Sequence, residues 1–241
     1  MSTWKINCDC GESYGRLSVG QDEAVIPLIH SANIACGFHG GDPSTIRRTA
    51  KLAAKYGVAC GAHPSLPDLM GFGRRVMSID PAEFTDLMIY QLGAVRALIE
   101  AESVECTHVK PHGVLYSMLY DVRLAHAFAE AIERVDPNIA WICEANKPTA
   151  RVAKERGLRV LHEFTADRAY DAEGNLVITR VPEAVDPAFA VEQVRQVIET
   201  GKIRTTAGTH KEIAASLICI HSDTPNSAEV AGALRSYLDT L

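Results

Sequence analysis

Short apolar segments that end on a charged or imidazole side chain recur along this chain, and this recurrence constrains the fold more than any other feature. In the segment His108 to Gly113, two histidines and a lysine occupy alternate positions. Alternate residues of an extended strand share one face, so we predict that His108, Lys110 and His112 point the same way from a strand that ends at Pro111. A solvated polar strand end is the simpler interpretation of this segment alone.

The segments alternate regularly between two types. The predicted strands cover residues 5–9, 32–36, 57–63, 106–110, 138–144, 158–164 and 215–221. The predicted helices cover residues 22–29, 43–56, 80–101, 121–135, 148–156, 187–200 and 226–241. Residues 171–178 are typical of a small turn and hairpin, and residues 201–211 of a hairpin or loop. Helical crossovers require parallel strands, so we expect one α/β domain over residues 1–241, either closed as a barrel or open with helices on both faces.

Residues capable of chemistry gather at the carboxyl ends of the predicted strands, which is where parallel barrels bind their ligands. If the sheet closes, these side chains share one mouth, whereas unrelated surface residues would be scattered along the chain. The residues at these ends are Asp9, His39, His63, Lys110, His112, Glu163, Asp167 and His221.

Composition excludes several classes of protein. The formal net charge is −6 and there is no long basic run, which argues against a nucleic-acid partner. No apolar run approaches the roughly 20 residues that span a membrane. The first residues lack the pattern of a signal peptide, so we expect a cytoplasmic location. The seven cysteines are an odd number and include no Cys-x-x-Cys pair, so we expect free, buried thiols.

Several motifs, in their order along the chain, resemble the LamB/YcsF family, the group of 5-oxoprolinase A subunits. The segments that carry the resemblance are Asn7–Glu12, Ala32–His39, Gly41–Pro43, Gly61–Pro64, Gly71–Arg75, His108–Gly113 and Asp223–Pro225. Cys10, Gly40 and Ser222 stand where Leu, Ala and Gly are common in the family. The resemblance covers nearly the whole chain. It implies a TIM-like (β/α)7 barrel related to glycoside hydrolases and polysaccharide deacetylases. It also implies ATP-dependent opening of 5-oxoproline to glutamate, together with partner subunits B and C.

Six residues are candidates for the catalytic chemistry of opening a lactam. Asp9 is suited to act as a general base on water or to orient a histidine, and Glu12 lies just beyond it. Neutral imidazoles shuttle protons near pH 7, and an ammonium group stabilises a developing oxyanion. The shuttle candidates are His39, His63 and His112, and the ammonium group is that of Lys110.

Substrate-binding candidates come from the neighbouring loops and strand faces. Arg74 or Arg168 could bind the substrate carboxylate in bidentate fashion. The other candidates are Asn7, Asp42, Glu163, Asp167 and His221. Asp42 also has the position of a helix N-cap before Pro43. The chain contains no P-loop motif, so we expect ATP chemistry mainly on the partner subunits and the hydrolytic step here.

The same residues also fit two other functions. Asp9, His39 and His63 could hold a divalent metal, as in a deacetylase or amidohydrolase that acts alone. Alternatively, the chain could be a non-catalytic subunit that binds a lactam or a sugar.

Overall fold

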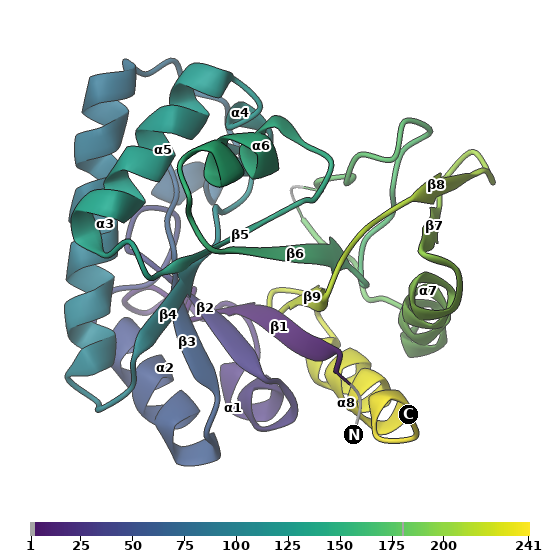
Figure 1. The fold of residues 1–241 in the computed structure, drawn as a ribbon. Helices are drawn as coiled ribbons and strands as arrows, with labels where there is room; N and C mark the ends of the chain where they lie inside the picture. Colours follow the sequence, from purple (N-terminus) through teal and green to yellow (C-terminus); the bar gives the residue numbers. More distant parts are fainter. Residues whose placement is uncertain (1–2, 180) are drawn as a thin grey trace.

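The computed structural model describes residues 3–179 and 181–241, and its centre is a closed barrel of seven parallel strands (Figure 1). The strands are β1 (Lys5–Cys10), β2 (Ser31–Ala35), β3 (Ala59–His63), β4 (Cys106–Val109), β5 (Ala140–Cys143), β6 (Val160–Thr165) and β9 (Leu217–His221). Strand β9 pairs with both β6 and β1, which closes the ring. The predicted TIM-like barrel is therefore confirmed, and the open alternative is excluded.

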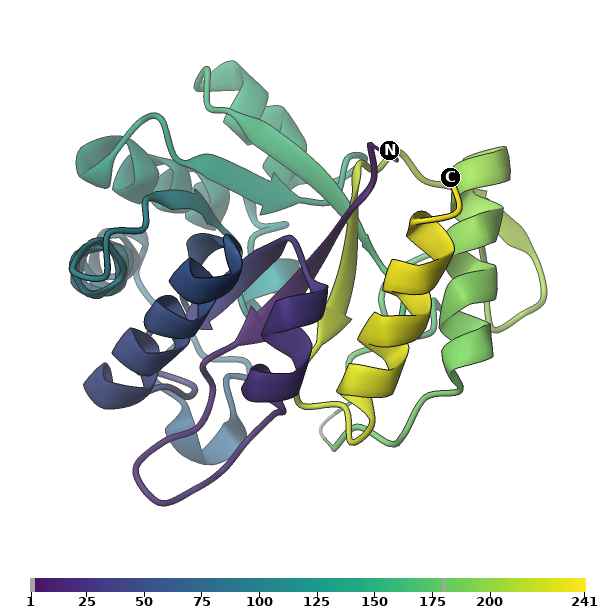
Figure 2. The same ribbon diagram turned by 90° about the horizontal axis from the view of Figure 1, so that it is seen from below.

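Helices surround the strands, as Figures 1 and 2 show. They are α1 (Asp22–Val25), α2 (Pro43–Tyr56), α3 (Pro81–Glu100), α4 (Leu115–Met118), α5 (Val122–Val135), α6 (Pro148–Glu155), α7 (Pro187–Thr200) and α8 (Ser227–Leu238). Two 3-10 turns are η1 (Ile26–Leu28) and η2 (Leu69–Gly71). Figure 2 shows α7 and α8 lying side by side against the barrel.

Aspartate caps begin four of these helices at the predicted places. Asp42, Asp80, Asp121 and Asp186 each accept a backbone N–H from the first turn of α2, α3, α5 and α7. Each such cap contributes about 1 kcal/mol to stability. These caps fix where each helix starts, and so they also fix the length of the loop above each preceding strand.

Three segments need comment, because the sequence left their structure open or predicted it only in part. Residues 22–29 form the short helix α1 followed by η1 rather than one helix, because Pro27 has no N–H to continue the α-helical pattern. Residues 171–178 form the predicted turn, which is closed by a single antiparallel bridge between Tyr170 and Leu176, and the Asp171 carboxylate accepts N–H groups of that turn. Residues 201–211 contain a hairpin of β7 (Lys202–Arg204) and β8 (His210–Glu212).

Side chains alternate between two environments along β1, as in any extended strand. Ile6, Cys8 and Cys10 belong to the hydrophobic core, whereas Asn7 and Asp9 are buried among polar groups. All seven cysteines are free and buried, as expected for small apolar side chains. The consequence is a barrel with an apolar layer under its helices and a polar interior.

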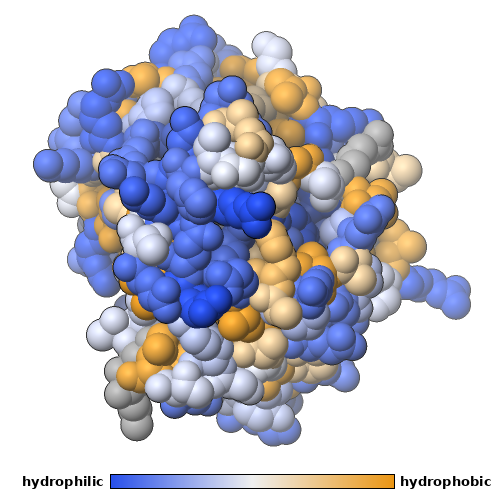
Figure 3. Space-filling model, turned by 90° about the vertical axis from the view of Figure 1, so that its right-hand side faces the viewer, coloured by the Kyte–Doolittle hydropathy of each residue, from blue (hydrophilic) through white to orange (hydrophobic). Residues whose placement is uncertain are grey.

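The molecular surface is mixed in character. Figure 3 shows hydrophilic side chains over much of one face, with apolar side chains in separate groups between them. Within residues 3–179 and 181–241, no helix is both long and apolar enough to cross a membrane.

The barrel interior leaves no room for a side chain at Gly61. A Cβ atom there would overlap the His108 ring and carbonyl, and the carbonyl cannot move without breaking the β3–β4 pairing. We expect Gly61→Ala to lower the free energy of unfolding by about 1–3 kcal/mol. The matched control is Gly93→Ala on the exposed side of α3, where an added Cβ atom would meet nothing within 4 Å. This change should raise the free energy of unfolding by about 0.5–1 kcal/mol. Urea titration of both variants measures the two effects, and equal effects would contradict the packing argument.

Candidate functional site

A buried ion pair between Asp9 and Lys110 lies at the carboxyl end of the barrel. The Lys110 Nζ atom is 2.7 Å from Asp9 Oδ1, and the same oxygen accepts a 2.7 Å hydrogen bond from Asn33 Nδ2. Burial opposes ionisation of both groups, but the charges of His63 and Lys110 hold the pKa of Asp9 well below its usual value. Asp9 in turn raises the pKa of Lys110 well above its usual value, against the effect of burial. The two groups therefore form a charged pair.

Polar side chains from other strands support this pair from within the barrel. Glu163 on β6 is 3.4 Å from Lys110 Nζ and accepts a 3.2 Å hydrogen bond from Asn7 Nδ2. His108 on β4 contacts Asn33 Oδ1 at 3.0 Å, and burial together with the charge of Lys110 lowers the pKa of His108 to about 4. Asn7 and neutral His108 thus form a supporting layer beneath the ion pair.

A second carboxylate orients His221 toward Asp9. His221 Nδ1 is 2.9 Å from Asp167 Oδ1, and the His221 backbone N–H donates to Asp167 Oδ2 at 3.0 Å. The other ring nitrogen, Nε2, lies 3.6 Å from Asp9 Oδ2. Burial favours the neutral form of Asp167, but His221 outweighs it and lowers the pKa of Asp167. The result is an Asp–His pair whose free nitrogen faces the Asp9 carboxylate.

A cavity opens above these groups and exposes two guanidinium groups. Asp9, Lys110, His221, Arg74 and Arg168 all line it. Arg74 binds Asp223 Oδ2 at 2.7 Å, and Arg168 binds the other oxygen of the same carboxylate at 3.1 Å. The cavity therefore has a floor of mixed charge and, on one side, two guanidinium groups that share the Asp223 carboxylate.

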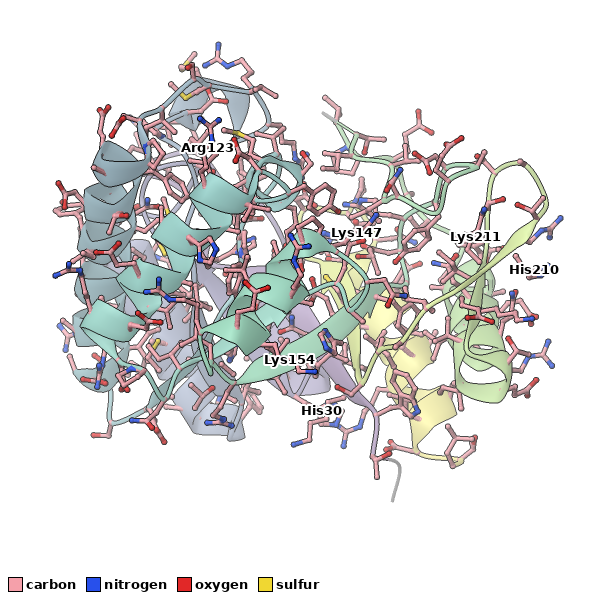
Figure 4. The ribbon with its side chains drawn as sticks, turned by 45° about the horizontal axis from the view of Figure 1, so that its top comes forward. His30, Arg123, Lys147, Lys154, His210 and Lys211 are labelled. Carbon is pink, nitrogen blue, oxygen red and sulfur yellow. The ribbon has the colours of Figure 1, made fainter. Side chains whose placement is uncertain are left out.

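The sequence analysis missed several residues that line this cavity. The Tyr116 hydroxyl donates to Glu163, and Glu144 lines the same wall while it accepts from the Tyr120 hydroxyl. Residues 176–179 also line the cavity. Lys147, labelled in Figure 4, connects their loop to the start of α6 because its Nζ atom donates to Asn175 Oδ1 at 2.6 Å. Glu144 could have been found, because it ends a predicted strand, whereas Tyr116 gave no signal of its own.

Beside the ion pair lies a separate group formed by Glu12, His39, His63 and His112, which we call the imidazole cluster. Its side chains are almost fully buried, and His39 and His112 stack with ring centroids 3.6 Å apart. Burial and the neighbouring histidines lower the pKa values of His39 and His112 well below their usual range. Burial and the nearby acids Asp223 and Asp9 raise the pKa of Glu12 well above its usual value.

The loop after β3 covers the imidazole cluster closely. Phe72 has a left-handed backbone (φ 55°), and its carbonyl accepts a 2.8 Å hydrogen bond from His112 Nε2. A Cβ atom at Gly73 would lie 2.7 Å from the His112 ring and 2.9 Å from His39 Cβ, so only glycine permits this approach. The close packing of this Gly-rich loop on the imidazole rings thus depends on Gly73 having no side chain.

The predicted site residues do not all lie in one group. Asp42 caps α2 with its carboxylate on Ser44 N and Thr45 N, and it does not line the cavity. The metal set predicted from sequence paired His39 and His63 with Asp9. The structure instead groups these two histidines with Glu12 and His112, with one donor atom from each within 4.8 Å of the others, and places Asp9 in a different group. His63 contacts both groups, because its Nε2 atom is also 3.1 Å from Asp9 Oδ2.

The fold and site together define a parallel α/β barrel with charged and imidazole side chains gathered around a cavity at the carboxyl ends of its strands. Residues 4–240 match the LamB/YcsF family, and the chain belongs to that family.

Full-length relatives agree with this assignment. The chain is 44% identical over 237 residues to the 5-oxoprolinase A subunit of Chloroflexus aggregans, covering 97% of this chain and 94% of the relative. It is 45% identical over 237 residues to the 5-oxoprolinase A subunit of Pyrococcus abyssi, covering 97% and 93%. The crystal structure of a lactam utilization protein from Thermus thermophilus is 40% identical and superposes with a TM-score of 0.89, covering 98% and 96% of the two chains.

The Asp167–His221 pair gives a prediction for acid stability. Asp167→Asn removes the charged acceptor of the His221 ring and backbone N–H, and one of the two carboxylate partners of Arg168, so we expect a loss of about 3–5 kcal/mol at pH 7. Because the folded pKa of Asp167 is lowered, its contribution is present above the unfolded value near 3.8 and is lost as the pH falls through the folded value. The stability difference between wild type and variant should therefore narrow below about pH 4.

Denaturant unfolding at several pH values measures this difference. The matched control is Asp86→Asn, which changes an exposed aspartate on α3 and should alter stability by less than about 0.5 kcal/mol. A difference for Asp167→Asn that stays constant down to about pH 2.5, which is roughly one unit below the ordinary pKa of an aspartate, would contradict the assignment.

Proposed function

We propose that this chain performs the hydrolytic ring opening of 5-oxoproline to glutamate as one subunit of a cytoplasmic, ATP-using 5-oxoprolinase. The observation that carries the proposal is the Asp9–Lys110 pair on the floor of a cavity that also exposes Arg74 and Arg168. 5-Oxoproline has a lactam carbonyl and one carboxylate, and the cavity offers a separate group for each. Relatives named as 5-oxoprolinase A subunits and as a lactam utilization protein support the choice of substrate.

The residues supply a complete path for the proton. Asp9 takes a proton from water as the water oxygen bonds to the lactam carbonyl carbon, and Lys110 faces the oxygen that gains negative charge. His221 Nε2 receives the proton from Asp9 Oδ2, because its Nδ1 is held by Asp167. When the carbon–nitrogen bond breaks, His221 delivers this proton to the ring nitrogen, which becomes the amine of glutamate. One water is consumed and both residues regain their first state.

ATP enters the proposal through partner subunits. A lactam is a stabilised amide, and transfer of the γ-phosphoryl group of ATP to its oxygen would release ADP and make the carbonyl carbon more electrophilic. Ring opening by one water would then leave an acyl phosphate, which a second water hydrolyses to glutamate and inorganic phosphate. This chain has no P-loop motif, so we assign that phosphoryl transfer to subunits B and C and the hydrolytic step to this chain. The subunit designation in the names of the relatives agrees with this division of labour.

One observation favours a second candidate. The imidazole cluster contains the nitrogen and carboxylate donors of a metal hydrolase, which could act on an amide without ATP or partners. A third function, lactam binding without catalysis, needs the cavity but no base.

Glutamate release from 5-oxoproline separates the three functions. We expect release only when this chain, subunits B and C, and ATP are combined, because activation and hydrolysis lie on different chains. Activity of this chain alone, without ATP and abolished by a chelator, would instead establish the metal hydrolase. In the full mixture, Asp9→Asn should lower kcat by roughly 100- to 10,000-fold through loss of the base.

The control for Asp9→Asn is Asp86→Asn, which should keep full turnover because Asp86 lies on the exposed side of α3. Circular dichroism of each variant confirms folding before the assay. Unchanged turnover by a folded Asp9→Asn protein would leave only the binding function.

Because two guanidinium groups line the cavity, we expect the loss of one of them to weaken substrate binding. Arg74→Gln removes a guanidinium from the cavity, so we expect KM for 5-oxoproline to rise about 10- to 100-fold, with a smaller change in kcat. Arg123→Gln is the control, because Arg123 is exposed on α5, away from the cavity (Figure 4). A lowered kcat with unchanged KM in Arg74→Gln would show that Arg74 acts on the reacting atoms instead.

A further inference from the structure

Four consecutive strands of the barrel deliver one member each to the imidazole cluster. Glu12 follows β1, His39 follows β2, His63 ends β3 and His112 follows β4. Their exposed fractions are 2%, 1%, 1% and 3%, so these polar groups must be satisfied inside the protein. Apart from the support that His63 gives Asp9, the proposed reaction uses none of the four.

Backbone carbonyls fix which ring nitrogens of two histidines carry hydrogen. His63 Nδ1 lies 2.7 Å from the Lys110 carbonyl, and His112 Nε2 lies 2.8 Å from the Phe72 carbonyl. Carbonyl oxygens only accept, so both of these nitrogens donate. The remaining nitrogens, His63 Nε2 and His112 Nδ1, face each other at 3.0 Å. His63 Nε2 is also 3.1 Å from Asp9 Oδ2, so one cation, either a proton or a metal ion, can satisfy these atoms together.

The carboxyl group of Glu12 and the ring of His39 complete this arrangement. Glu12 Oε1 is 3.5 Å from His112 Nδ1 and 3.2 Å from His39 Nε2. Four atoms bound at about 2.1 Å to one tetrahedral ion are roughly 3.4 Å apart, close to these separations.

We propose that Glu12, His39, His63 and His112 bind one divalent metal ion of the zinc type. Three imidazoles and one carboxylate are the donors that this class of ion prefers, and four protein ligands leave no open position for substrate. The site is therefore structural. It joins the segments after four strands and holds the loop of Phe72 and Gly73 in place. The site stands independently of the proposed function, because no step of the ring opening passes through it.

Metal binding by the isolated chain tests this proposal directly. The chain is purified without a metal-binding tag, stripped with a chelator, and titrated with Co²⁺ or Zn²⁺. We expect a stoichiometry close to one ion per chain by elemental analysis, the visible absorption of tetrahedral Co²⁺, and a higher Tm with metal than without it. Because these readouts need neither substrate nor partners, failure of the catalytic proposal leaves them unchanged.

Two variants and one control connect the ion to these residues. His112→Asn and Glu12→Gln should each weaken Co²⁺ binding by more than the roughly 10- to 100-fold that loss of an outer-shell partner costs. His210→Asn should bind Co²⁺ as the wild type does, because His210 is exposed on β8, far from the barrel interior (Figure 4). Because Gln has the same shape as Glu, Glu12→Gln keeps the test decisive even if His112→Asn fails to fold. Absence of stoichiometric binding in wild type, or binding unchanged in both variants, would overturn the proposal and leave a shared proton between His63 and His112.

Discussion

The buried Asp9–Lys110 ion pair is the interaction on which the rest of the site depends. Taking two charges out of water costs several kcal/mol for each ion, and their attraction offsets this only when the remaining lone pairs and protons are also satisfied. Asn33 completes the coordination of Asp9, and Glu163 and Cys219 lie against the Lys110 amine. The pair joins β1 to the residue after β4, two strands that are not neighbours in the barrel. Only closure of the sheet brings these partners together, so the site and the fold require each other.

This pair divides the carboxyl end of the barrel into two chemical halves. On one side, Asp9, Lys110 and Asp167 keep their charges and line or support the cavity, because each has an opposite charge or a donor within hydrogen-bonding distance. On the other side, burial drives His39, His112 and Glu12 of the imidazole cluster toward neutral forms. The proposed proton transfer uses the charged half, where groups can exchange a proton with water in the cavity. The proposed metal ion binds in the other half.

Local patterns in the sequence predicted much of this arrangement. The predicted strand ends named most of the side chains that the structure brings together at the mouth of the barrel. Asp42 shows the limit of such reasoning, because the position before Pro43 fits a cap and a ligand equally well and only the hydrogen bonds to Ser44 and Thr45 decide. The choice between Asp9 and Glu12 as partner of His39 was also hidden, since it depends on how the loop after β1 folds back over residues far away in the sequence. Tyr116 reaches the site from α4, which is too short to show a helical pattern of apolar residues in the sequence.

The loop after β3 links the two halves physically. A left-handed conformation at a non-glycine residue such as Phe72 costs roughly 1–2 kcal/mol, and here it is offset by the hydrogen bond from His112 and by edge contacts with the His39 and His112 rings. Two residues later the same loop places the Arg74 guanidinium in the cavity, 4.9 Å from the centre of the Phe72 ring. The state of the imidazole cluster therefore sets the backbone that holds Arg74. A structural ion beneath this loop would position the group that receives the substrate carboxylate while taking no part in the reaction itself.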